Sequence, residues 1–373
     1  MQSCDFYIGI MSGTSLDGID IALVTFKQNK TKLIDSVTVP YQHKTKEKID
    51  TLVNSRECSL HLLCEVDRQI ATEYTSAVLE LLKINNLEPQ QIKAIGCHGQ
   101  TIKHSPNNDI PYTFQIGDPN TLAALSGITT VADFRRKDIA LGGQGAPLTP
   151  AFHQHAFQDK EKNRLIINIG GITNVTILPK ENSPLEIIGF DTGPGNTLMD
   201  HFFQMNFQQP YDKSGDLAKQ GKILKPLIDH ILKSETYFEL PPPKSTGTDY
   251  FNLAWFDSFN PNLIDSNKPI DLLATLNELT AITIASAINK LPISVDEIYF
   301  CGGGIHNTTL VKSIKKHTGI NYFSTEKLGV QPDYLEAIAF AWFAKNTLEG
   351  KTSNLPSVTS ASKPTILGGI FFP

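Results

Sequence analysis

Two stretches of the chain, residues 6–40 and 164–191, show the same succession of hydrophobic patterns. In each, two alternating apolar runs are separated by a turn of small residues and are followed by a third apolar run. Alternation over four to eight residues is typical of half-buried strands, so each stretch predicts a three-stranded meander. Helical periodicity follows the first stretch, from about Leu60 to Leu82. We therefore expect two α/β halves of similar plan, although the sequence identity between them is slight.

The length of the chain also favours two domains. At 373 residues it exceeds the size at which a single hydrophobic core usually keeps growing. We expect domain I to span residues 1–133 and to be completed by the C-terminal segment 353–373, and domain II to span residues 134–352. The composition, 40% hydrophobic and 19% charged, is that of a globular protein. The net charge of -5 and the scattered basic residues predict no nucleic-acid partner.

Cysteine and hydropathy patterns narrow the class further. The five cysteines are odd in number and form no Cys-x-x-Cys pair, so neither a disulfide framework nor a structural zinc site is expected. No apolar run approaches the ~20 residues of a membrane helix, and the N-terminus lacks the features of a signal peptide. We therefore expect a cytoplasmic protein without a membrane partner.

Three glycine-rich loops, MSGTSLDG, NIGGITN and CGGGIHN, follow predicted strands. Such loops expose backbone N–H groups and let a phosphate approach closely. Each alone is weak because glycine turns are common, but three in two domains predict a nucleotide held between two hairpin turns. The chain lacks G-x-x-x-x-G-K-[ST] and a complete G-x-G-x-x-G. Ser12, Thr14 and Ser15 could donate to phosphate oxygens, while Asp17 or Asp20 could hold the accompanying Mg²⁺.

The stretch IIGFDTGPGN places Asp191 between an apolar strand and a Gly-Pro-Gly bend. A carboxylate at the lip of a sheet is well placed for catalysis. It could equally organise the turn, and both readings stay open. Asp-Thr-Gly also matches the aspartic-protease motif, but that chemistry needs two such carboxylates and the chain has no second copy.

Arg135 and Arg136 stand beside the glycine-rich turn LGGQGAP. A guanidinium fork there could hold a substrate carboxylate through two hydrogen bonds. The alternative for either arginine is a structural ion pair with Asp133 or Asp138.

His98, Thr101 and Glu336 are polar residues with two readings each. His98 and Thr101, in CHGQTIKH, come at the end of a buried strand and could line an active site or belong to the core. Glu336 follows Asp333 at the spacing of a capping box for a helix from about Tyr334, or it could point from the first helical turn into the site.

The order of the motifs resembles that of the anhydro-N-acetylmuramic acid kinase family from residue 7 to about residue 370. The matching segments are GIMSGTSLDGID, GCHGQTIKH, VADFRRKDIALGGQGAP, NIGGITNVT, GFDTGPGN, PKSTG, CGGG, PDYLEAIAFAW and NLPSVT. The resemblance implies a two-domain actin-like ATPase fold of the sugar kinase, Hsp70 and actin type, with a nucleotide cleft between the domains. It also implies an ATP-dependent sugar kinase that opens 1,6-anhydro-N-acetylmuramic acid with water and phosphorylates O6, giving N-acetylmuramic acid 6-phosphate and ADP in peptidoglycan recycling.

The resemblance also assigns roles to residues. Asp191 would be the catalytic base, with Glu336 and one of Arg135 and Arg136 near the sugar and its lactyl carboxylate. From the residues themselves we also expect His98 and Thr101 to line the substrate and Asp17 or Asp20 to hold Mg²⁺. The ATP-binding residues would be Gly13, Thr14, Ser15, Leu16, Asp17, Gly18, Ile19 and Asp20 in the first loop, Asn168, Gly170 and Gly171 in the second, and Gly302, Gly303 and Gly304 in the third.

The chain departs from the family pattern at two places. Thr248 and Asp249 follow PKSTG where the family has Arg-Glu, and Ser353 and Ser360 stand where glycine is usual. The family suggests a homodimer. The alternative function is an actin-like or Hsp70-like ATPase module without a sugar substrate, which would hydrolyse ATP in the absence of sugar.

Overall fold

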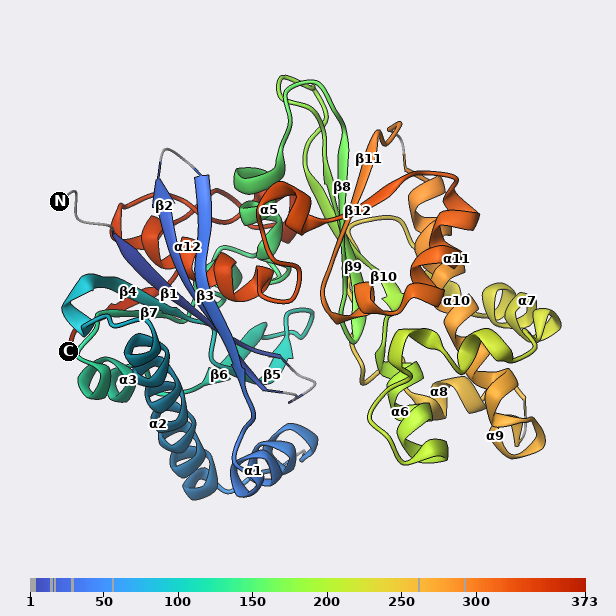
Figure 1. The fold of residues 1–373 in the computed structure, drawn as a ribbon, viewed down its shortest axis with the longest axis horizontal. Coiled ribbons are helices and arrows are strands. Elements are labelled where there is room, and N and C mark those ends of the chain that lie inside the picture. Colours follow the sequence, from blue (N-terminus) through green and yellow to red (C-terminus); the bar gives the residue numbers. More distant parts are fainter. Residues whose placement is uncertain are drawn as a thin grey trace. The chain divides into compact units, whose positions relative to one another are not determined.

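The structure is a computed structural model that describes residues 5–13, 16, 18–27, 30–55, 57–260, 262–291 and 293–373. Its contacts divide the chain into two compact units (Figure 1). Unit 1 comprises residues 1–156 and 329–373, and unit 2 comprises residues 157–328.

Unit 1 is built on a six-stranded sheet with the order β13-β7-β4-β1-β2-β3. Strands β1, β2 and β3 form the expected antiparallel meander, whereas β4 pairs parallel to β1 on its other side and β7 continues in parallel. The antiparallel pair β5 and β6 forms a separate hairpin. The strands are β1 (Phe6–Ser12), β2 (Ile19–Lys27), β3 (Lys30–Val39), β4 (Ile92–Cys97), β5 (Gln100–Ser105), β6 (Tyr112–Ile116), β7 (Thr130–Ala132) and β13 (Gly369–Phe371).

Helices cover both faces of this sheet. They are α1 (His43–Asn54), α2 (Leu60–Ile84), α3 (Pro119–Ser126), α4 (Arg136–Ala140), α5 (Thr149–Phe157), α12 (Leu335–Leu348) and α13 (Pro356–Thr359), with a 3₁₀ turn at Pro89–Gln91. Ile8 and Ile10 of β1 pack in one cluster with Tyr74 of α2. Because successive side chains of a strand point to opposite faces, Gly9 lies on the other face, against α12.

Helix α12 approaches the sheet unusually closely. A Cβ at Gly9 would overlap the carbonyl oxygen of Ala337, and a Cβ at Gly96 of β4 would overlap that of Phe340. The helix is apolar around its whole circumference and nearly all of its residues are buried, as expected of a central core helix. It therefore belongs to unit 1, so the unit boundaries differ from the expected division at residues 133/134 and 352/353.

Unit 2 repeats the strand plan of unit 1. Its five-stranded sheet has the order β10-β9-β8-β11-β12, with an antiparallel meander β8-β9-β10 and the parallel strands β11 and β12 on the other side of β8. The expected recurrence of the meander is confirmed. The strands are β8 (Arg164–Ile169), β9 (Ile172–Leu178), β10 (Ile188–Pro194), β11 (Glu297–Cys301) and β12 (Tyr322–Ser324).

The helices of unit 2 pack around the 21-residue helix α10. They are α6 (Thr197–Phe207), α7 (Lys225–Ser234), α8 (Leu253–Asp257), α9 (Leu263–Ser266), α10 (Pro269–Asn289) and α11 (Thr308–Thr318), with 3₁₀ turns at Lys213–Gly215, Ala218–Gln220, Thr236–Glu239, Gly303–His306 and Thr325–Leu328. Contrary to expectation, α10 is long and apolar enough to cross a membrane, with a mean hydropathy of 1.2 over its most apolar stretch. However, 67% of that stretch is buried and its leucines and isoleucines belong to the core of unit 2, which explains its apolar character.

We predict that Gly96→Ala destabilises the protein by about 3 kcal/mol or more, because the added Cβ would meet the backbone of α12, which cannot move aside as a side chain could. Urea unfolding measures the change. Gly369→Ala is the matched control, since its Cβ would make only ordinary contact with Phe371. Equal stabilities of the two variants would contradict the close approach of α12 to β4.

Candidate active site

The predicted loops gather at one edge of each sheet. In unit 1, β1 and β4 are adjacent and parallel, and their carboxyl ends lead into the loop 13–18 and into His98. In unit 2, β8 and β11 are adjacent and parallel, and they lead into the second and third glycine loops. The strand order reverses at β1 and at β8, and open α/β sheets bind ligands outside the carboxyl ends of the strands at such points. The topology therefore places the sequence-predicted loops where a ligand is expected.

A buried glutamine, Gln100, hydrogen-bonds the backbone at the start of the first loop and was missed in the sequence analysis. Thr14, Ser15 and Asp17 lie outside the described residues, so their predicted roles stay predictions. Gln100 is fully buried, and its amide donates to the carbonyl of Gly13 over 3.2 Å. A polar residue directly after a buried strand, in CHGQT, was the signal for it. Leu16 adopts a positive φ of 55° with its side chain buried, which fixes the middle of the loop.

Two polar residues beside this loop are engaged within unit 1. The Ser12 hydroxyl is buried, 2.6 Å from the Tyr74 hydroxyl and 3.2 Å from the Gly99 carbonyl oxygen. It therefore braces the loop from inside the core. Asp20, at the start of β2 next to Ile19, accepts a hydrogen bond of 2.6 Å from the Thr38 hydroxyl of β3. One carboxylate oxygen of Asp20 thus stabilises the meander.

Arg135 and His98 form the centre of the polar cluster in unit 1. Arg135 donates from Nε to Nε2 of His98 over 3.0 Å and from Nη1 to the Gly145 carbonyl over 2.8 Å. Burial lowers the pKa of Arg135 to about 10, against the opposing charges of Glu336 and Asp138, so the side chain stays cationic at neutral pH. Burial and the charge of Arg135 hold the pKa of His98 well below its usual range. His98 is therefore a neutral acceptor that orients Arg135.

The structure distinguishes the two arginines. Arg136 is exposed and donates from Nε to Asp133 over 2.9 Å, which is the structural ion pair considered from the sequence. Arg135 instead lies among His98, Gly145 and Glu336.

Thr101, on β5, accepts a 3.2 Å hydrogen bond from the Gln115 amide.

Glu336 lies in the first turn of α12, where the sequence left a capping box and a position in the site both open. The N-cap is Tyr334 and not Asp333, the Tyr334 side chain makes no capping hydrogen bond, and the helix begins at Leu335, one residue later than expected. The charge of Glu336 acts instead on Arg135, whose pKa it raises. The structure thus brings Glu336, Arg135 and His98 together, although they lie far apart in the sequence.

A buried carboxylate fixes the glycine-rich turn beside Arg135. Asp138 is fully buried and accepts three hydrogen bonds of 2.8 Å, from the Gly145 N–H, the Asn354 amide and the Thr359 hydroxyl. The turn is thereby tied to the segment NLPSVT. Ser360, at the end of α13, has a positive φ of 65°, which accounts for the glycine that is usual there.

Asp191 lies in the middle of the edge strand β10, which continues to Pro194 beyond the strand end expected at this aspartate, and it stands at an irregularity in the pairing of β10 with β9. Its Oδ2 accepts a 2.9 Å hydrogen bond from the Thr246 N–H, and its own N–H donates to the Lys244 carbonyl over 3.0 Å. Burial raises the pKa of Asp191 to about 7, against the opposing effects of the Thr246 N–H and the Lys244 charge. A general base works best with a pKa near the operating pH.

The second and third glycine loops pack against each other in unit 2. The carbonyl oxygens of Gly170 and Gly171 accept hydrogen bonds from the backbone N–H groups of Asn196 and Gly195, at 2.8 and 2.9 Å. A Cβ at Gly304 would overlap Ile169, the last residue of β8. The glycines therefore have a packing reason as well as the predicted binding role. The remaining predicted residues of these loops are Asn168 at the end of β8, which is buried, and Gly302 and Gly303, which follow β11.

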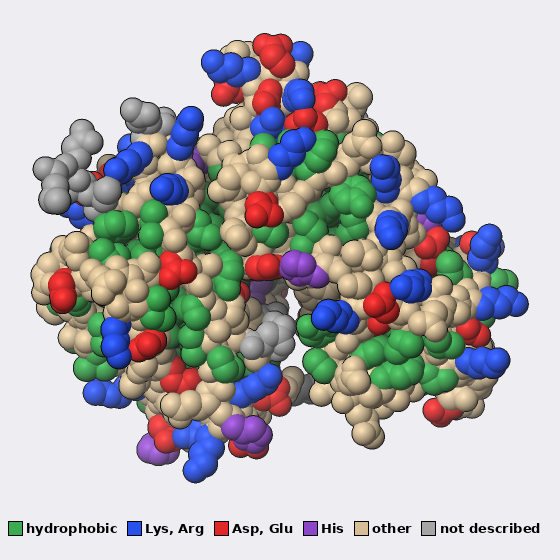
Figure 2. Space-filling view, in the orientation of Figure 1, with side chains coloured by type: hydrophobic (Ala, Val, Ile, Leu, Met, Phe, Trp, Pro, Cys, Tyr) green, Lys and Arg blue, Asp and Glu red, His purple; other side chains and the backbone are tan. Residues whose placement is uncertain are grey.

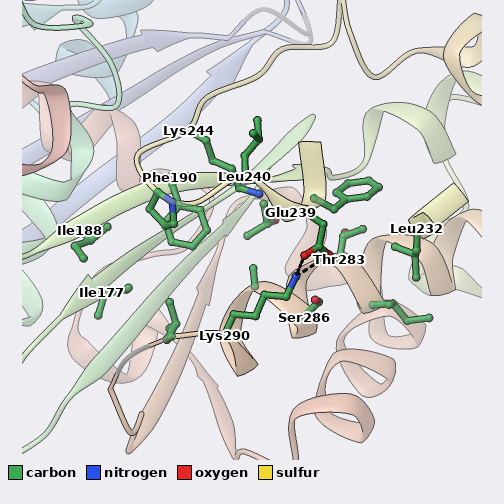
Figure 3. A pocket seen from close by; sticks show the side chains of 16 residues that line it. Ile177, Ile188, Phe190, Leu232, Glu239, Leu240, Lys244, Thr283, Ser286 and Lys290 are labelled. Atoms are coloured by element: carbon green, nitrogen blue, oxygen red, sulfur yellow. Dashed lines mark hydrogen bonds and ion pairs between the residues drawn. The ribbon is translucent and has the colours of Figure 1, made fainter. Parts of the chain in front are cut away.

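A pocket lies on the face of β10 opposite to the Asp191 side chain. Phe190 and Ile188, alternate residues of β10, line one wall, and Ser286 of α10 and Lys290, the residue that follows this helix, line another (Figure 3). Lys290 forms an ion pair with Glu239 at the rim, over 2.8 and 2.9 Å. The residues on either side of Asp191 thus pack towards this pocket while its carboxylate turns to the loop that carries Thr246.

The described residues contain no group of three or more His, Cys, Asp or Glu side chains that could enclose a metal ion. Mg²⁺ needs no such enclosure in a nucleotide site, because it is usually held by one or two carboxylates, substrate phosphates and water. Asp20, a carboxylate at the start of β2 beside the first loop, is a ligand of the type that Mg²⁺ prefers.

We predict that Asp191→Asn gains stability relative to the wild type as the pH rises from 4 to 7. The folded protein holds the Asp191 proton up to about pH 7, whereas the unfolded chain loses it near pH 4. The unfolded state then binds fewer protons, so the wild type loses up to about 1.4 kcal/mol per pH unit in this window. Urea unfolding of both proteins at several pH values measures the difference. A constant difference would contradict a raised pKa at Asp191.

The comparisons with known proteins agree with this geometry. The sequence matches the family model described as Anhydro-N-acetylmuramic acid kinase over residues 5–373. A protein of that name from Coxiella burnetii (strain Dugway 5J108-111) is 47% identical over 368 residues, which are 98% of this chain and 97% of the relative. Another from Pasteurella multocida (strain Pm70) is 45% identical over 374 residues, or 98% of this chain and 96% of the relative.

Among solved structures, the chain resembles the activator of the 2-hydroxyisocaproyl-CoA dehydratase from Clostridium difficile with bound ADPNP. The TM-score is 0.44 and the identity 12%, over 92% of this chain and 96% of that one, a likeness that supports no inference about ligands. The predicted fold class, a two-domain actin-like ATPase fold, is confirmed by the sequence matches together with the repeated strand order. The chain belongs to the anhydro-N-acetylmuramic acid kinase family.

Proposed function

We propose that this protein is an ATP-dependent kinase that opens the ring of 1,6-anhydro-N-acetylmuramic acid and phosphorylates O6, giving N-acetylmuramic acid 6-phosphate and ADP. Membership of the family supports the activity. The observation that carries the mechanism is Asp191, a carboxyl on an edge strand, held by the Thr246 N–H, with a pKa raised to about 7.

The chemistry of the substrate explains why a base is needed. O6 is tied in an ether and offers no hydroxyl proton, so the base must act on water. Asp191 takes a proton from a water whose oxygen bonds to the anomeric carbon, and the bond between that carbon and O6 breaks. The freed O6 then bonds to the γ-phosphorus, and ADP leaves. The Thr246 N–H binds Oδ2 of Asp191, which leaves Oδ1 for the water.

The glycine loops would hold the phosphates of ATP through backbone N–H groups. Asp20, with Asp17 from outside the described residues, would hold Mg²⁺, which neutralises charge on the β- and γ-phosphates when bound. The predicted binding roles of Asn168, Gly302 and Gly303 belong to the same proposal. Thr248 and Asp249, which replace the Arg-Glu of the family, follow the segment that binds Asp191 and make none of the hydrogen bonds to Asp191 described above.

Arg135 is the arginine that we assign to the lactyl carboxylate of the sugar. It stays cationic, and His98 and Gly145 fix its orientation, so the side chain is prepared to bind an anion. Arg136 already pairs with Asp133. Glu336, whose charge acts on Arg135, and Thr101 complete the proposed sugar site.

The wider setting of the enzyme stays a prediction. We expect a cytoplasmic homodimer that acts in peptidoglycan recycling, without a nucleic-acid or membrane partner. Figure 2 shows basic and acidic side chains mixed over the face in view rather than gathered in a basic stripe, which fits the first of these absences. The alternative, an actin-like ATPase module without a sugar substrate, predicts ATP hydrolysis that does not depend on sugar.

The decisive assay is incubation with ATP, Mg²⁺ and 1,6-anhydro-N-acetylmuramic acid, with the phosphosugar detected by mass. In H₂¹⁸O, the label is expected at C1 of the sugar at early times and not in the phosphate. We predict that Asp191→Asn lowers kcat by ~10²- to 10⁴-fold, the usual contribution of a general base, while ATP binding is kept. Near-normal turnover would remove Asp191 from the mechanism, and rapid ATP hydrolysis without sugar would favour the alternative function.

We predict that Arg135→Lys raises KM for the sugar by about tenfold or more, because lysine cannot reproduce the two parallel hydrogen bonds to a carboxylate. Arg136→Lys, the matched control, should change KM less than about threefold. Steady-state kinetics with 1,6-anhydro-N-acetylglucosamine, which lacks the lactyl group, distinguishes the loss of a contact with the lactyl carboxylate from a general disruption of the sugar site. If Arg135→Lys weakens both sugars equally, Arg135 does not read the lactyl carboxylate.

A further inference from the structure

Three hydrogen bonds join Asp191 to one segment, residues 237–246, and a fourth bond lies within that segment. The Asp191 N–H donates to the Lys244 carbonyl over 3.0 Å, and the Thr246 N–H donates to Oδ2 of Asp191 over 2.9 Å. The Tyr237 hydroxyl donates to the Asp191 carbonyl oxygen over 2.9 Å, and Nζ of Lys244 donates to the Tyr237 carbonyl oxygen over 2.9 Å. Asp191, Lys244 and Tyr237 are thus linked in a ring of hydrogen bonds, so a shift of one of these residues displaces the other two.

Lys244 takes part in these hydrogen bonds through both its backbone carbonyl and its side-chain ammonium group. Its backbone binds Asp191, while its ammonium group reaches the turn that carries Tyr237 and lies 4.5 Å from the centre of the Tyr237 ring. Among the described residues it has no carboxylate within ion-pair distance, unlike Lys290, which pairs with Glu239. The side chain of Lys244 therefore links two parts of the segment and adds a positive charge beside Asp191.

Neighbouring charges change the pKa values of Lys244, Asp191 and Tyr237. Burial and the charge of Lys290 lower the pKa of Lys244, while Glu239 and Asp191 raise it. In return, the charge of Lys244 lowers the pKa of Asp191, as does the Thr246 N–H, against the larger effect of burial. Burial and the charge of Asp191 raise the pKa of Tyr237, whose hydroxyl thus stays a donor.

The segment has a second anchor that does not involve Lys244. The buried carboxylate of Glu235 accepts hydrogen bonds from the Tyr237 N–H at 2.9 Å, the Tyr250 hydroxyl at 2.9 Å and the Trp255 indole at 2.7 Å. These bonds fix the loop on both sides of residues 240–246. Removal of the Lys244 ammonium should therefore leave the loop folded and change only how it holds Asp191.

We propose that Lys244 is a positioning residue for Asp191, whose ammonium group holds the carboxylate in its catalytic place through the Tyr237 turn and favours the ionised form. The inference rests on the proposed role of Asp191 as the general base. It gives a reason for the loop PKSTG to lie beside the edge strand β10 at Asp191.

The test uses Lys244→Met in the full chain, which keeps the aliphatic stem and removes the charge. The titration of the Asp191 carboxyl, followed by ¹³C NMR in the enzyme without substrate, should move upward by about one pH unit. The acid limb of kcat should move with it, so that kcat at pH 7 falls about fivefold, while KM for the sugar changes less than about twofold. Lys244→Arg should restore kcat to within about twofold of the wild type. Lys290→Met is the matched control and should leave the Asp191 titration in place, because Lys290 pairs with Glu239 outside the hydrogen-bonded set.

A purely structural role of Lys244 would lower kcat equally at every pH and leave the titration unmoved, which would overturn the proposal. Tyr237→Phe provides a second variant, since it removes the bond to the Asp191 carbonyl but keeps the ring beneath Lys244. It should lower kcat about threefold or more, and an unchanged kcat would also count against the proposal. The NMR titration requires no turnover. If the wild type does not phosphorylate the sugar, the proposed function fails while the effect of Lys244 on Asp191 is still measured.

Discussion

The close approach of α12 to β1 and β4 is the constraint on which the polar cluster of unit 1 depends. It is possible only because Gly9 and Gly96 lack side chains at the contact. The same two strands end in the first loop and in His98, and the same helix carries Glu336 in its first turn. Loop, histidine and glutamate are therefore positioned by one packing contact, and a side chain at either glycine would displace them together.

Each unit contains an ionisable side chain whose charged form is disfavoured by burial, Arg135 in unit 1 and Asp191 in unit 2, but only Asp191 is brought to titrate near neutral pH. Arg135 is half-buried and stays cationic, because its guanidinium does not lose a proton near neutral pH and its neighbours accept its hydrogen bonds. Asp191 is a carboxyl with one N–H partner, so burial moves its pKa to about 7. Burial therefore leaves the charge of Arg135 in place but moves the titration of Asp191 towards neutral pH, which suits the roles proposed for them.

The sequence was sufficient to predict the strands and to single out the glycine loops and Asp191 as candidates, because these depend on local patterns: alternation, turn residues and a carboxylate after an apolar run. It could not separate Arg135 from Arg136, which are adjacent and alike in composition, since the difference lies in tertiary contacts with His98 and Asp133. Gln100 and Glu235 were missed for the same reason. The apolar helix α12 was placed in the wrong half, because hydrophobicity on all sides shows that a helix is buried but not which sheet buries it.

The departure at Thr248 and Asp249 shows how the local design can tolerate change. The bonds to Asp191 come from residues 237, 244 and 246, upstream of both positions, and two of them are made by backbone groups that substitution does not alter. Downstream, Tyr250 and Trp255 anchor the loop to Glu235. Thr248 and Asp249 lie between the two anchored parts. Their side chains can therefore differ from the Arg-Glu of the family while the position of the carboxylate is kept, and any effect of the exchange should be found in ligand contacts rather than in the base itself.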